Sequence, residues 1–81
     1  MRSFEERLAL AKAILQKLSV QSLSRTVLEK RVLKEYEGSH ATFEGMFQCL
    51  FRMGCIEKSS GAHLAPYRIT LVGRKFLEGL P

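Results

Sequence analysis

Polar side chains recur four residues apart along an otherwise apolar segment, residues 40–53. Residues four apart share one face of a helix, so they form a narrow stripe there: His40, Glu44, Gln48 and Arg52. Side chains of these types bond the edges of nucleic-acid bases, since glutamine pairs with adenine through two hydrogen bonds and a carboxylate accepts one from cytosine. The same stripe is also what the solvated face of a buried helix looks like. Gly45 lies in this segment, where glycine costs about 0.5–1 kcal/mol relative to alanine; close approach of a nucleic acid or of a second helix would explain it, as would a neutral surface position.

The charge of the chain is basic. Thirteen Lys and Arg residues oppose eight acidic residues, all of them Glu, for a net charge of +5. A basic excess on a small domain is typical of proteins that neutralise phosphates, and many small domains without a nucleic-acid partner carry as much. The charge therefore favours a nucleic-acid partner without specifying one.

The residues needed for catalysis do not come together in the sequence. Without any aspartate, a Ser-His-Asp triad cannot be assembled. The six glycines are scattered and form no phosphate-binding loop. We therefore expect neither an enzyme nor a cofactor.

The metal-ligating residue types are few: His40, His63, Cys49 and Cys55. Their spacing matches no compact pair of zinc ligands, so we expect no metal site. Two cysteines do not make a disulfide framework, and we expect buried free thiols with raised pKa values. An intermolecular or regulatory disulfide is the alternative.

The length of 81 residues predicts a single domain, residues 1–81, with one modest hydrophobic core. No apolar run approaches the roughly 18–20 residues that a membrane span needs. The first residues are acidic where a secretion signal would be apolar, so we expect a cytoplasmic protein without a membrane partner.

Helical periodicity covers most of the chain. Ser3 and Glu6 form a capping-box pattern before a helix over residues 3–18, whose apolar face begins at Phe4. Ser24 precedes a second helix over 25–36. Gly38 suits the left-handed position after that helix, and Ser39 can cap a third over 40–53.

A different pattern follows Gly54. Strand-like runs at 55–58 and 67–71 enclose a Ser/Gly/Ala/His/Pro loop, and Thr70 can cap a last helix. The predicted fold is therefore mainly α with a small β-hairpin, an α+β domain in the order helix, helix, helix, strand, strand, helix.

Three stretches carry a family resemblance. Residues 50–56 (LFRMGCI) are similar to the "leucine, three residues, glycine, any, isoleucine" exit of a recognition helix, and 67–77 (YRITLVGRKFL) to the "tyrosine, any, leucine, threonine, two residues, glycine" close. Residues 24–32 resemble the opening of the preceding helix. Together they resemble winged helix-turn-helix domains, closest to small prokaryotic MarR- and PadR-type transcriptional regulators. The resemblance implies sequence-specific binding of double-stranded DNA.

The resemblance also implies a site. In this family the third helix enters the major groove, and the residues that would contact bases are Ser39, His40, Thr42, Glu44 and Gln48. The second helix, the end of the third and the hairpin, or wing, would contact the DNA backbone, the wing also the minor groove: Arg25, Thr26, Lys30, Lys34, Arg52, Lys58, Ser59, Ser60, His63 and Arg68.

Two alternatives stay open. Winged helices also serve as protein-interaction modules, and the apolar third helix, with Cys49 and Phe51, would be the docking surface for a protein partner. The same residues could instead make a homodimer. MarR- and PadR-type proteins pair through extra flanking helices that 81 residues do not accommodate. If this chain pairs, we expect the seam to lie on the first and last helices.

Overall fold

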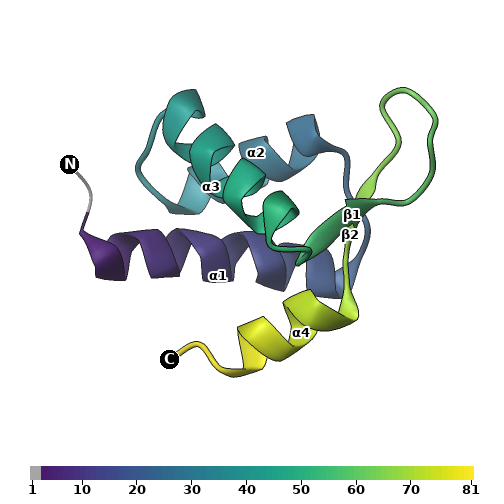
Figure 1. Cartoon of the computed structure of the whole chain (residues 1–81). Helices are drawn as coiled ribbons and strands as arrows, with labels where there is room; N and C mark the ends of the chain where they lie inside the picture. Colours follow the sequence, from purple (N-terminus) through teal and green to yellow (C-terminus); the bar gives the residue numbers. More distant parts are fainter. Residues whose placement is uncertain (1–2) are drawn as a thin grey trace.

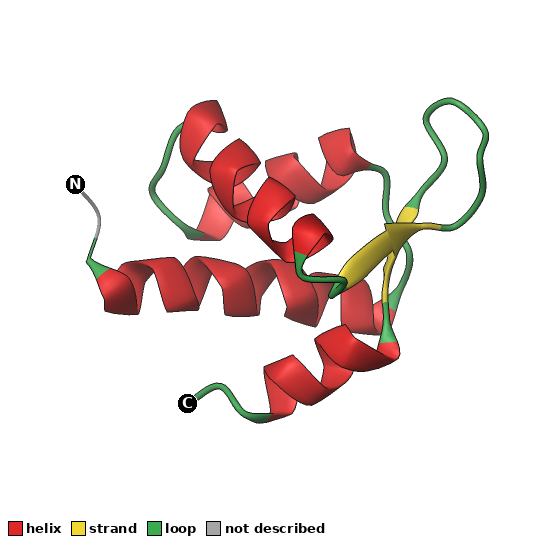
Figure 2. Cartoon of the chain, in the orientation of Figure 1, coloured by secondary structure: helices red, strands yellow, loops and turns green. Residues whose placement is uncertain are grey.

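The computed structural model describes residues 3–81, with four helices and one antiparallel hairpin (Figures 1 and 2). The elements follow in the order α1 (Phe4–Val20), α2 (Arg25–Glu35), α3 (His40–Arg52), β1 (Ile56–Lys58), β2 (Tyr67–Ile69) and α4 (Leu71–Glu78). The predicted class, mainly α with a small hairpin, and the predicted order are confirmed. None of the helices in the described range is both long and apolar enough to cross a membrane.

Hydroxyl side chains begin all four helices, as the sequence predicts. Ser3, Ser24, Ser39 and Thr70 each accept a hydrogen bond from the amide three residues further on, at 3.0–3.3 Å. These bonds satisfy amides that have no partner inside the helix. The four starting points are therefore fixed by local sequence.

The ends of two helices differ from expectation. α1 runs two residues beyond 18, and Ser19 within its last turn donates to the Gln16 carbonyl oxygen at 2.7 Å. The left-handed conformation predicted for Gly38 is wrong, because α2 ends on extended Tyr36, and Gly54 is the glycine with positive φ, at 80°. At Gly54 the amides of residues 54 and 55 bond the carbonyls of Phe51 and Leu50, which ends α3 in a Schellman motif.

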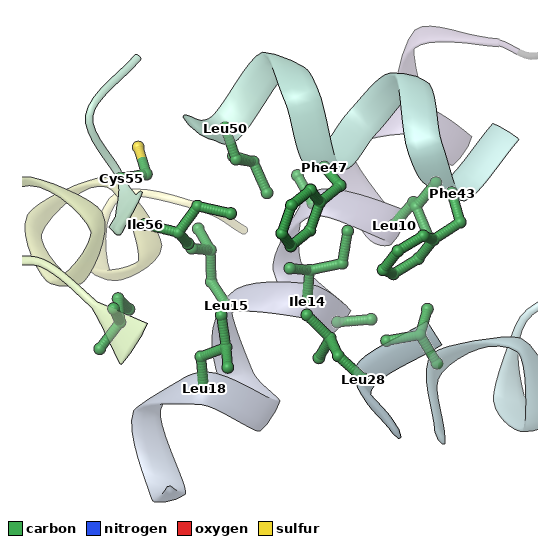
Figure 3. Packing of buried hydrophobic residues seen from close by; sticks show 14 of the residues in the cluster. Leu10, Ile14, Leu15, Leu18, Leu28, Phe43, Phe47, Leu50, Cys55 and Ile56 are labelled. Atoms are coloured by element: carbon green, nitrogen blue, oxygen red, sulfur yellow. The ribbon is translucent and has the colours of Figure 1, made fainter. Parts of the chain in front are cut away.

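The hydrophobic core lies between α1 and the other elements (Figure 3). Phe43, Phe47 and Leu50 of α3 are at most 1% exposed, and they face Ile14 and Leu15 of α1, which are fully buried. Phe4, predicted to begin the apolar face, is 71% exposed. Helical periodicity places Phe4 beside that face but does not say whether another element covers it.

The hairpin is short and tied to a third segment. Ile56 pairs with Ile69 and Lys58 with Tyr67, so both strands are shorter than predicted. Leu23, between α1 and α2, forms an isolated bridge with Tyr67 through two backbone hydrogen bonds of 3.1 and 2.7 Å. That bridge fixes the start of α2 beside the hairpin, a contact that the sequence does not predict.

Candidate nucleic-acid interface

A hollow of about 390 Å³ separates the start of α2 from the hairpin. Its lining combines residues from α2, from the first turn of α3 and from the hairpin with its loop, residues 59–66. It brings together five of the residues predicted to contact DNA: Arg25, Thr26, His40, Lys58 and His63. Three segments that are far apart in the sequence thus share one concave surface.

The outer face of α3 is the second part of the candidate surface. Ala41, Gly45, Cys49 and Arg52 are exposed on it, and Gln48 is half-buried. Figure 1 shows α3 and the hairpin loop on the same side of α1, with α4 on the other side. A Cβ atom added at Gly45 would meet nothing within 4 Å. Packing of Gly45 against α2 is therefore excluded as the reason for this glycine.

Three of the predicted contact residues already pair with carboxylates. Arg25 forms an ion pair with Glu44, His40 Nδ1 lies 2.8 Å from Glu29 Oε2, and Arg68 lies 3.1 Å from Glu57 Oε2. These internal pairs reduce the positive charge that the surface can offer to phosphates. The Arg68–Glu57 pair is exposed on both sides, and exposed pairs contribute only about 0–1 kcal/mol, so Arg68 can exchange its carboxylate for a phosphate.

Arg25 and Glu44 are partly covered by their surroundings. The Arg25 side chain is 38% exposed and the Glu44 side chain 28%. The Arg25 guanidinium also lies over the Phe47 ring, with Cζ 5.4 Å from the ring centroid. Glu44 Oε2 is enclosed and faces this guanidinium, so the carboxylate is turned towards α2 and away from the outer face of α3.

Apart from Thr26, which lines the hollow, and Gln48, which is half-buried on α3, the remaining predicted contacts fall into two groups. Ser39 and Thr42 are engaged in the cap of α3, with their hydroxyl oxygens 3.1 Å apart. The other group is exposed, and within residues 3–81 its members form no ion pair: Lys30, Lys34, Arg52, Lys58, Ser59, Ser60 and His63. Lys34 is two helical turns beyond Thr26 on α2 and does not line the hollow.

The two cysteines differ in burial. Cys55 is fully buried, and this burial, with a smaller contribution from Cys49, raises the pKa of its thiol. Cys49 is exposed and its Sγ lies 3.8 Å from Met53 Sδ, so the prediction that both thiols are buried is wrong for Cys49. In the described part of the chain, no three His, Cys or Glu side chains are placed to hold a metal ion.

Tyr67 and Leu64 are two of the five residues of the hollow that were not predicted to contact DNA. Tyr67 packs edge-on against Phe47, with ring centroids 4.9 Å apart, and it links the hairpin to α3. Leu64 is 74% exposed and has a φ of 65°, which is unusual for a leucine. Strand alternation could have indicated that Tyr67 packs inward against α3. Nothing in the sequence indicates that a leucine in a loop is exposed.

No protein-family model, curated protein or solved structure matches the chain. The function of the chain is therefore inferred from the geometry of the described residues.

Proposed function

We propose that the chain binds double-stranded DNA sequence-specifically, as a small transcriptional regulator of the winged helix-turn-helix kind. The third helix, α3, enters the major groove, and the hairpin loop, as the wing, contacts the backbone or the minor groove. The observation that carries the proposal is the hollow, where the start of α2, His40 of α3 and Lys58 of the hairpin surround one concave surface.

The hollow has the chemistry that a DNA phosphate requires. Arg25 and Thr26 open α2 and line the hollow, and the first amides of a helix, which lack partners inside it, attract anions. Thr26 and Lys58 contribute a hydroxyl and a cation from opposite sides. A phosphate held there would fix the register of α3 in the adjacent groove without itself carrying sequence information.

The protein-interaction alternative loses part of its support. Phe43, Phe47 and Leu50 are buried in the core of the same chain and are not available to a partner. Of the large apolar side chains of α3 and its C-cap, Phe51 and Met53 stay exposed, at 45% and 49%, and Cys49 beside them is exposed too. A protein partner or a second copy that docks on α3 would have to use these residues. Pairing through α1 and α4 stays a prediction.

A salt titration tests the proposal. The chain is titrated with duplex DNA of random sequence at several salt concentrations, and the association constant is measured by fluorescence anisotropy. Binding through phosphates gives a straight fall of log K with log salt, with a slope of about −0.9 for each neutralised phosphate. Absence of duplex binding even at low salt would reject DNA binding and favour the protein-interaction alternative.

Gly45→Ala is expected to change stability and binding in opposite directions. Alanine in the open space at Gly45 should stabilise α3 by about 0.5–1 kcal/mol, because it has the higher helix propensity. The added methyl group would stand on the outer face of α3, so affinity for duplex DNA should fall by about fivefold or more, equivalent to ~1 kcal/mol. Thermal denaturation and anisotropy measure the two effects. Unchanged affinity would show that DNA does not approach α3 at this residue.

A further inference from the structure

A row of three side chains connects α2 to the outer face of α3. Arg25 pairs with Glu44 Oε2, and Glu44 Oε1 accepts a hydrogen bond of 3.2 Å from Gln48 Nε2. Arg25 is itself held over the Phe47 ring, which is 1% exposed and belongs to the core. The glutamine amide is therefore connected through two charged groups to the hydrophobic core.

The chemistry of the carboxylate fixes the direction of the Gln48 amide. An ionised carboxylate only accepts hydrogen bonds, so the amide must present its NH₂ group to Glu44. A half-turn of the amide would bring its oxygen against Glu44 Oε1, and the two acceptors would repel. After this bond, Gln48 retains one free N–H and the lone pairs of Oε1.

The remaining donor and acceptor match one base. Adenine shows an acceptor, N7, beside a donor, the N6 amino group, in the major groove. Guanine shows two acceptors, N7 and O6, so Oε1 of a fixed amide would oppose O6. A glutamine amide that rotates freely can turn both of its N–H groups towards guanine. Such a glutamine would therefore no longer distinguish adenine from guanine.

We infer that Glu44 is a positioning residue, held by Arg25, that orients Gln48 to select adenine over guanine. The inference rests on the proposed DNA binding and deepens it. It gives Glu44 and Arg25 different roles from the base and backbone contacts that the sequence predicts. Both act through Gln48, and neither needs to touch DNA.

The test compares the base preference of single and double variants. Duplexes are first selected by the wild-type chain from a random-sequence pool, and the base pair at which Gln48→Ala loses its preference is identified. A bidentate contact there should favour adenine over guanine by about 5- to 150-fold, the fold equivalent of its usual discrimination. Replacing that adenine by 7-deazaadenine, which lacks the N7 acceptor, should remove most of the preference.

Glu44→Ala should reduce the adenine preference to that of Gln48→Ala, and the double variant should lose nothing more. Its affinity for random duplexes should rise, because a negative charge is removed beside the phosphates. A purely structural role would lower specific and random binding together, and thermal denaturation verifies that each variant is folded.

Two further charge-removing variants separate charge from positioning. Glu57→Ala breaks the pair with Arg68 on the hairpin without touching Gln48, so random binding should rise and the adenine preference should stay. Glu44→Gln removes the same charge but gives residue 44 an NH₂ group; Arg25 takes its amide oxygen, so the NH₂ group faces Gln48 and the adenine preference should fall.

Three outcomes would overturn the inference. An unchanged preference in Glu44→Ala overturns it while DNA binding stands, and a preference lost in Glu57→Ala as well traces the effect to charge instead. If the wild-type chain binds no duplex at all, the proposed function fails first.

Discussion

The double variant Lys30→Ala/Lys58→Ala is expected to bind random duplex DNA about 60-fold more weakly than the wild-type chain at ~0.1 M salt. Both lysines are exposed and form no ion pair within the described residues, and Lys58 lines the hollow. Each phosphate contact contributes about 0.9 to the slope of log K against log salt, so the slope should become shallower by about 1.8. Anisotropy titrations at several salt concentrations measure both quantities.

A matched control removes two other cations. Arg74 and Lys75 are exposed on α4, which lies on the far side of α1 from the hairpin loop (Figure 1). Arg74→Ala/Lys75→Ala makes the same change in net charge, and its salt slope should match that of the wild-type chain. Equal losses in the two double variants would mean that binding follows net charge alone, and the hollow would not be the phosphate site.

Gly73→Ala should destabilise the fold by about 3 kcal/mol, because its methyl group has no space. A Cβ atom at Gly73 would lie 2.2 Å from the Cys55 carbonyl oxygen and 2.8 Å from Ile69 Cγ1. That carbonyl already accepts a 2.9 Å hydrogen bond from the Thr70 amide, so it is held in place. A loss of this size corresponds to a fall in Tm of about 12–24 °C for a domain of this length.

Gly45→Ala is the natural comparison for Gly73→Ala. Both replace a helical glycine by alanine, but nothing lies near the new methyl group at residue 45. Urea denaturation followed by far-UV circular dichroism should therefore show opposite signs for the two variants. If Gly73→Ala were as stable as the wild-type chain, α4 would not pack against the hairpin as closely as the structure describes.

Local signals in the sequence determined where the helices begin and how the elements follow one another. The four hydroxyl caps are sequence-local, since each needs only a serine or threonine and an amide three residues away. The end of α3 at Gly54 is also a local signal. Its left-handed conformation needs a glycine and does not depend on a contact with a distant residue. The α+β class and the order of elements follow from these signals and from hydrophobic periodicity.

Only the tertiary structure decided which charged side chains are available to contact DNA and which pair with another side chain of the chain. Arg25 is a cation at the start of a helix, and nothing in its neighbourhood along the sequence predicts a partner nineteen residues away in Glu44. The same holds for His40 and Glu29, which meet because the turn between α2 and α3 folds one helix against the other. Side-chain pairing across elements depends on how the helices cross, which periodicity does not specify.

The hollow is also a product of the tertiary structure. The sequence predicts residues of the right types on α2 and on the hairpin, but their distance apart depends on the bridge between Leu23 and Tyr67. Backbone pairing of this kind has no side-chain signature, because any two residues can exchange these hydrogen bonds. The sequence by itself therefore determined the elements and the candidate residues, and only the packing of those elements decided which residues share a surface.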